Sequence, residues 1–166
     1  MGLLDQIGGI LKQYESPAAP SSDVSTHFDQ VASVVPSGTL ADGIAHALRS
    51  GQTSGFSQTV SELFGRANPS QKAGMLNQLL SAVTPQSAAM LAGTAVSASG
   101  ATPEQAQAVS PDVIKQLADH AQSADPAVVD RVSAFYAQHP TLVKGIGATA
   151  LTLIMSRMSQ QHAPNR

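Results

Sequence analysis

The chain has 166 residues, a formal net charge of −2 and no cysteine. The lack of cysteine excludes disulfides, thiolate zinc sites and a cysteine nucleophile. Its nine basic residues form no stripe of the kind that nucleic-acid binding needs, so no nucleic-acid partner is expected. Charged residues make up 12% of the chain, about half the usual share, so Ser, Thr, Gln and Ala are expected to form much of the surface.

Residues 1–15 form an amphipathic segment that is expected to be helical. When the segment is wound at about 100° per residue, its apolar residues fall on one arc of about 120°. Gly8 and Gly9 lie on the remaining surface, and each costs about 1 kcal/mol of helix propensity. The segment therefore needs a surface on which to fold. Its apolar residues are the candidate partner-binding residues, namely Leu3, Leu4, Ile7, Ile10, Leu11 and Tyr14.

The same segment carries the one family resemblance in the chain. The stretches MGLLD at 1–5 and IGGIL at 7–11 resemble the start of the YidB-like family of small bacterial helical proteins. The resemblance implies a bacterial helical protein, and it transfers no functional residue.

The N-terminus also bears on the expected location of the protein. It lacks the basic region that opens a secretory signal. Gln6 stands where the myristoylation pattern requires Ser or Thr. A cytoplasmic protein is therefore expected.

Residues 16–24 are rich in proline and serine and contain almost no bulky side chain, which is typical of a flexible linker. We therefore divide the chain into four parts. These are an amphipathic N-terminal helix at 1–15, a linker at 16–24, a helical domain at 25–160 and a frayed tail at 161–166.

Within the helical domain, a capping residue stands directly before a proline at five places. This pair predicts a helix start, because the short side chain accepts hydrogen bonds from free N–H groups of the first turn. Proline at the first helical position gives up only an N–H that has no partner there. The five pairs are Asn68-Pro69, Thr84-Pro85, Thr102-Pro103, Ser110-Pro111 and Asp125-Pro126, and His139-Pro140 is predicted to start the last helix with a poorer cap.

Apolar residues recur at helical intervals along the domain, and no alternating strand pattern of useful length appears. The most apolar stretch, 140–158, is predicted to be a single helix with neighbours on several sides. Lys144 and Arg157 bracket only twelve uncharged residues in it, too few to cross a membrane. The predicted fold is all-α, a compact array of about seven to nine short helices around this apolar C-terminal helix.

The sequence contains no recognisable catalytic or cofactor-binding motif, so we expect neither an enzyme nor a bound cofactor. Asp42 and His46 are four residues apart on a predicted helix, a spacing that occurs in metal sites. No third ligand lies nearby in the sequence. A solvated helix face is therefore the preferred interpretation, and no metal is expected.

Four residues are candidates for contact with a ligand. Met75, Met90 and Met155 fall at apolar helical positions, where methionine fills a core or lines an adaptable apolar pocket. Arg157 falls within the apolar half of the last helix. Its stem can lie along the core while the guanidinium reaches water, or it can anchor a carboxylate of a ligand or partner.

Two hypotheses for function follow. The first is a non-enzymatic interaction protein whose tethered N-terminal helix docks on a partner protein or on a second copy of the chain. The second is a carrier of an apolar or lipid-like small molecule in a Met-lined helical pocket. Attachment of residues 1–15 to a membrane surface is less favoured, because Lys12 is the only basic side chain of that segment.

Overall fold

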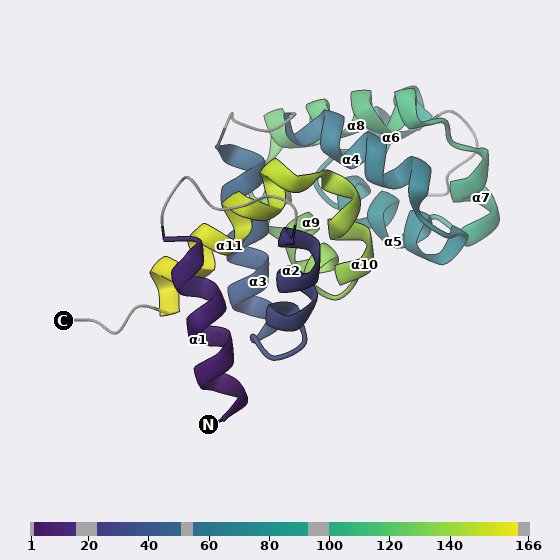
Figure 1. Cartoon of the computed structure of the whole chain (residues 1–166). Helices are drawn as coiled ribbons and strands as arrows, with labels where there is room; N and C mark the ends of the chain where they lie inside the picture. The colour runs from purple at the N-terminus through teal and green to yellow at the C-terminus, as the bar shows by residue number, and fades with distance from the viewer. Residues whose placement is uncertain (1, 16–22, 51–54, 93–99, 163–166) are drawn as a thin grey trace.

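The computed structural model describes residues 2–15, 23–50, 55–92 and 100–162 (Figure 1). The fold is all-α, as predicted. The described residues form 11 helices, of which 9 have at least seven residues, and they contain no strand. No described helix is both long enough and apolar enough to cross a membrane.

The helices follow one another with short connections. In chain order they are α1 (Leu3–Gln13), α2 (Val24–Ala32), α3 (Ser37–Arg49), α4 (Phe56–Arg66), α5 (Pro69–Leu80), α6 (Pro85–Ala92), α7 (Pro103–Ala108), α8 (Pro111–Ala124), α9 (Val128–Ala137), α10 (Pro140–Val143), the 3-10 turn η2 (Lys144–Ile146) and α11 (Ala148–His162).

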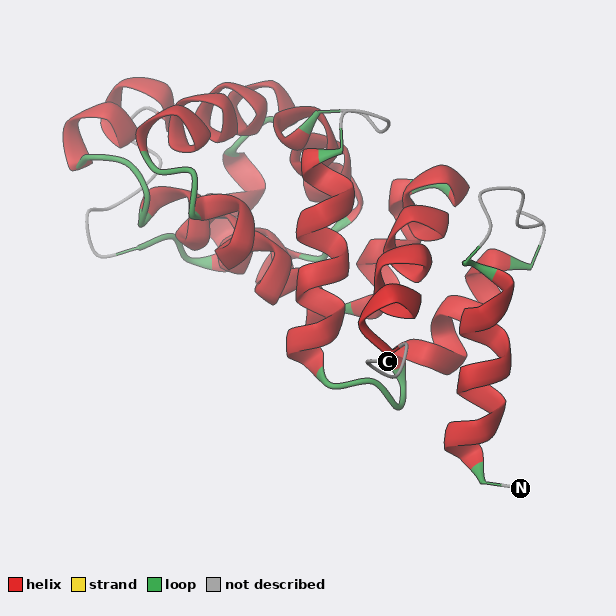
Figure 2. Ribbon diagram, turned by 90° about the vertical axis from the view of Figure 1, so that its left-hand side faces the viewer, coloured by secondary structure: helices red, strands yellow, loops and turns green. Residues whose placement is uncertain are grey.

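The helices form two groups that share one core. Helices α1, α2, α3 and α11 pack together at one end of the molecule, where α11 contacts α3, α1 and α2 (Figure 1). Helices α4 to α8 form the other end, with α4 along α8 and α5 along α7. Helix α9 joins the groups, because it packs along α3 and also contacts α5 and α8 (Figures 1 and 2).

The pairs of capping residue and proline set the helix starts at four of the five predicted places. Asn68 and Thr102 each form a capping box, in which the cap side chain and a glutamine three residues later exchange bonds with the backbone. The hydroxyl of Ser110 accepts a hydrogen bond from the N–H of Val113 at 3.4 Å. The hydroxyl of Thr84 accepts one from the N–H of Ser87 at 3.3 Å.

The fifth predicted start, at Pro126, is wrong by two residues, because α9 begins at Val128. Asp125 Oδ1 accepts a hydrogen bond from the N–H of Ala127 at 3.0 Å. Its Oδ2 lies 3.0 Å from the guanidinium of Arg131. Asp125 therefore closes a short turn ahead of the helix, and the helix forms after that turn.

The prediction of one helix over 140–158 is also wrong. The stretch is divided into α10, η2 and α11, and the break falls at Gly147, whose φ of 109° is rarely accessible to residues with a side chain. Two long-range contacts hold the turn before it. Lys144 Nζ binds the carboxylate of Asp29 at 2.8 Å, and Arg66 donates to the carbonyl of Gly145 at 3.0 Å.

Two glycines allow neighbouring helices to come close. A Cβ at Gly43 in α3 would lie 3.2 Å from the carbonyl oxygen of Ile154 in α11. A Cβ at Gly74 in α5 would lie 2.5 Å from the ring of Phe135 in α9. Gly43 therefore lets the backbones of α3 and α11 approach each other directly, and Gly74 makes room on α5 for the ring of Phe135 from α9.

Candidate functional site

The candidate functional site is the surface of the body on which α1 lies. Helix α1 packs on α11 and α2 of its own chain (Figures 1 and 2). The side chains of Ile7, Leu11 and Tyr14 are 3%, 2% and 1% exposed, and Ile10 is half-buried against the same core. The arc predicted to bind a partner is therefore a buried face of the folded chain, and its neighbours are α11 and α2.

Two of the six predicted partner-binding residues cannot be placed in this way. The backbone of Leu3 and Leu4 belongs to the first turn of α1, but their side chains lie outside what the structure describes. The interface of α1 with the body therefore rests on Ile7, Ile10, Leu11 and Tyr14.

The two adjacent glycines of α1 are not required by its packing. A Cβ built at Gly8 or at Gly9 would meet no atom within 4 Å outside its chain neighbours and the backbone of its own helix. Each glycine costs about 1 kcal/mol of helix stability relative to alanine. Helix α1 is therefore a weak helix that depends on the body for its stability.

A polar contact joins the end of α1 to α2. The hydroxyl of Tyr14 lies 2.7 Å from Nδ1 of His27, and the two rings meet edge to face with their centroids 5.8 Å apart. Burial raises the pKa of the Tyr14 phenol above its usual value, and the nearby charge of Asp23 raises it further. The phenol therefore remains protonated at neutral pH, and its hydroxyl shares a hydrogen bond with Nδ1 of His27.

Helix α1 does not fill the whole surface that it covers. A cavity of about 150 Å³ lies between α1, the turn that joins α2 to α3, and α11. Most of its wall is apolar, and among the described side chains that line it Thr39 supplies the hydroxyl and Gln161 the amide. The lining residues are Ile7, Leu11, Val34, Val35, Pro36, Thr39, Met158 and Gln161.

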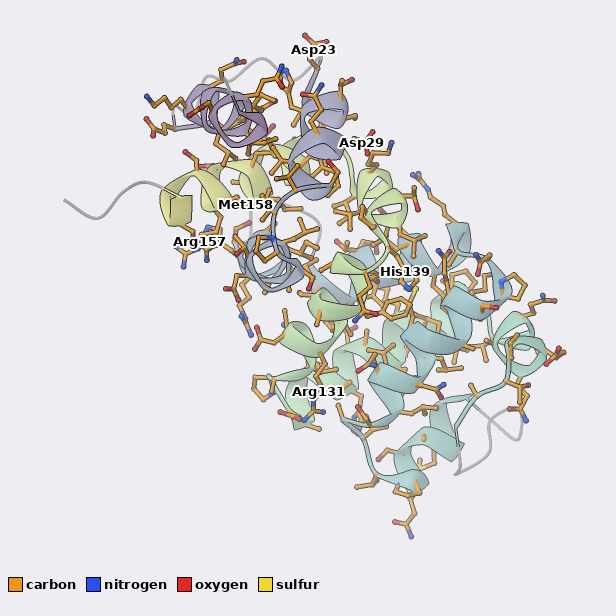
Figure 3. The ribbon with its side chains drawn as sticks, turned by 90° about the horizontal axis from the view of Figure 1, so that it is seen from below. Asp23, Asp29, Arg131, His139, Arg157 and Met158 are labelled. Carbon is orange, nitrogen blue, oxygen red and sulfur yellow. The ribbon has the colours of Figure 1, made fainter. Side chains whose placement is uncertain are left out.

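The four residues predicted to contact a ligand occupy different surroundings. Met75 in α5 and Met155 in α11 are fully buried in the core, whereas Met90 in α6 is 86% exposed and cannot line an interior cavity with them. Arg157 is half-buried on α11. Figure 3 shows its guanidinium on the side of α11 away from α1, which favours a stem along the core with the charge at the surface.

The methionine that does line the cavity is Met158, which lies between α1 and α3 (Figure 3). Its place on the apolar half of the last helix can be read from the sequence. Its position beside Ile7 and Leu11 cannot, because no local signal brings α1 to α11.

Asp42 and His46 belong to no cluster of potential metal ligands. Among the described residues, no three His, Asp or Glu side chains lie close enough together to hold a metal ion. The carboxylate of Asp42 instead accepts a hydrogen bond from the amide of Gln161 in α11 at 3.5 Å. His46 is exposed on α3.

Comparison with known proteins adds no relative to these observations. No family model, no curated protein and no solved structure matches the chain. The resemblance of residues 1–11 to the YidB-like family therefore stays a prediction.

Proposed function

We propose that this chain is a non-enzymatic interaction protein whose helix α1 exchanges between its own body and the body of a second copy. The observation that supports the proposal is the way α1 packs on the body. An intrinsically weak amphipathic helix covers an apolar surface of α2 and α11, and a Pro- and Ser-rich stretch at 16–22 joins it to that body.

The energies involved support an exchangeable helix. Burial of an Ile, Leu or Tyr side chain contributes roughly 1.5–3 kcal/mol each, and the bond between Tyr14 and His27 adds about 0.5–1.5 kcal/mol. Ordering the backbone of α1 costs about 1–2 kcal/mol per residue before its helical hydrogen bonds are counted. The ordering cost opposes the burial energy, and Gly8 and Gly9 weaken the helix further, so we propose that the docking of α1 is reversible.

A second copy is the best-matched alternative site for α1. It presents the same surface of α2 and α11, so every contact of the docked helix can be re-formed between chains. The seven residues 16–22 reach at most about 25 Å when extended. The two bodies of an exchanged dimer would therefore lie close together.

Other occupants have weaker support. The membrane-surface hypothesis has little electrostatic support, because Lys12 is the only basic side chain of residues 1–15. A carrier of a lipid-like molecule needs a pocket of about 300–1,000 Å³, and the cavity beside α1 has about 150 Å³. A different protein that binds the surface of α2 and α11 would compete with α1 for the same side chains.

The native mass of the full-length protein tests the proposal. Wild-type protein should form dimers in proportions that rise with protein concentration. Ile7→Asp should remain monomeric, because the charge would enter a position that is 3% exposed. Gln6→Asp is the matched control, since Gln6 is exposed on the same helix, and it should behave as wild type. A wild-type protein that stays monomeric at every concentration would refute the proposal.

Cross-linking distinguishes exchange between chains from other modes of dimerisation. The chain has no cysteine, so Tyr14→Cys and His27→Cys can each carry the only thiol of a molecule. A short bis-maleimide should link a mixture of the two variants into covalent dimers, because these side chains touch across the α1 interface. Each variant alone is the control. A mixture that gives no more dimer than the controls would show that α1 does not dock on a second copy.

A further inference from the structure

We infer that the cavity between α1, the α2–α3 turn and α11 binds a small, mainly apolar molecule, and that this ligand holds α1 on the body. The second part rests on the proposed exchange of α1. The first part stands by itself, because it depends only on the volume and lining of the cavity.

The volume of the cavity sets the size of the ligand. A cavity of about 150 Å³ with aliphatic walls accommodates a molecule of the size of benzene, and a chain-length lipid is too large for it. A buried water needs two to four polar partners. The pocket opens to solvent at Pro36 and Gln161, which are exposed. The buried side chains of Ile7, Leu11 and Met158 form its inner wall and offer water no strong hydrogen-bond partner, so this wall favours an apolar occupant.

The lining also sets the chemistry of the ligand. Val34, Val35 and Met158 present apolar surface to most of the occupant. Thr39 contributes a hydroxyl that can donate or accept a hydrogen bond. The best fit is therefore a compact ring or branched chain of about six to nine non-hydrogen atoms that carries one hydroxyl group.

The wall of the cavity comes from two parts of the chain that α1 exchange would separate. Ile7 and Leu11 belong to α1, whereas Val35 and Met158 belong to the body. A molecule in the cavity touches both, so it binds the docked state and loses one wall when α1 leaves. By mass action the ligand then multiplies the equilibrium constant for docking of α1 by a factor of one plus the ratio of free ligand concentration to Kd.

Binding is tested with phenol and benzene as probes, on full-length protein carrying ¹³C-labelled methionine, isoleucine and leucine methyl groups. Titration should move the methyl signals of Met158, Ile7 and Leu11 along saturating curves. The signal of Met75, which is buried in the core away from the cavity lining, is the internal control and should not move. The inference would be overturned if the methyl signals did not shift, if the shifts did not saturate, or if the Met75 signal shifted as much as the others.

Two variants locate the probe. Val35→Phe fills the cavity and should abolish the saturable shifts. Val113→Phe is the matched control, because Val113 is also half-buried but lies on α8, and it should leave them intact. Thr39→Val keeps the shape of the side chain and removes the hydroxyl. It should weaken phenol binding about fivefold and leave benzene binding unchanged. The assigned site would be contradicted if a folded Thr39→Val variant no longer bound either probe. It would also be contradicted if Val35→Phe still bound both probes.

The effect on α1 is read from the rate of cross-linking between the Tyr14→Cys and His27→Cys copies. Phenol should slow this rate in proportion to its occupancy, and it should have no effect when both copies also carry Val35→Phe. If no cross-link forms under any condition, the proposed exchange fails while the titration still decides the binding site. If cross-links form but phenol neither shifts the methyl signals nor changes the rate, the inferred site fails alone.

Discussion

Replacing Tyr136 by Phe should stabilise the protein, contrary to the usual effect of such a change. Tyr136 in α9 is fully buried, and its hydroxyl has no hydrogen-bond partner in the part of the chain that the structure describes. Burial raises the pKa of this phenol far above its usual value, so the O–H group stays protonated in the core at every working pH.

The expected gain follows from the environment of this hydroxyl. A buried polar group without a partner costs about 1–3 kcal/mol. Phenylalanine keeps the ring and its contact with Phe135, whose centroid lies 6.0 Å away. Loss of the hydroxyl removes some packing contacts as well, so the net gain should be about 1 kcal/mol. For a chain of this length that raises the Tm by about 2–4 °C.

Tyr14→Phe is the matched control for this change. Tyr14 is also buried, but its hydroxyl lies 2.7 Å from Nδ1 of His27. Removing it breaks a hydrogen bond and leaves the ring nitrogen of His27 without that partner, so this variant should lose about 1 kcal/mol. The same chemical change is therefore expected to have opposite signs at the two tyrosines.

Urea denaturation followed by far-ultraviolet circular dichroism measures both variants, with unchanged slopes required for the comparison. A Tyr136→Phe variant that is destabilised as much as Tyr14→Phe would refute the reasoning. It would mean that the Tyr136 hydroxyl has a partner in the core, such as a buried water.

Three further outcomes are expected. Gly43→Ala should destabilise the protein, because the added Cβ would press on the backbone of α11. Gly38→Ala on the same helix has open space around the added Cβ, so its free energy of unfolding should rise by about 0.5–1 kcal/mol, and thermal melts compare the two variants. Gly9→Ala should strengthen α1 by about 1 kcal/mol, which raises the Tm and, on the proposed function, slows the cross-linking exchange. Asp130→Asn should lower stability at pH 7 by less than about 1 kcal/mol, because the pair with Arg49 is exposed. The hydrogen bond from Arg49 lowers the pKa of Asp130, so this contribution is present above the unfolded pKa of about 4 and is lost as the pH falls through the lower folded pKa. Melts that show the same deficit at pH 2 and pH 7 would contradict it.

Features that depend on neighbouring residues could be predicted from the sequence. The caps at Asn68 and Thr102 act over three residues, so the pattern contains both partners of each hydrogen bond. The apolar arc of α1 follows from the 3.6-residue period of the helix, and three of its members are buried as a set. The all-α class rests on the same local rules, repeated along the chain.

The break at Gly147 shows where local rules end. The pattern over 140–158 is compatible with one continuous helix. The turn that interrupts it is held by Asp29 and Arg66, which lie 115 and 79 residues from their partners. The turn at Asp125 similarly depends on a side chain that competes for the backbone N–H of Ala127.

The sequence by itself therefore determined that residues 1–15 contain an amphipathic and weak helix, because both properties are local. Only the tertiary structure decided what covers its apolar arc, since that depends on where α2 and α11 come to lie. The cavity is a product of the same packing. Its walls come from residues 7–11, 34–39 and 158–161, and nothing in any one of these segments specifies the others. Contacts between distant segments depend on the shape and the buried area of the packed side chains, and the periodicity of a single helix determines neither of these.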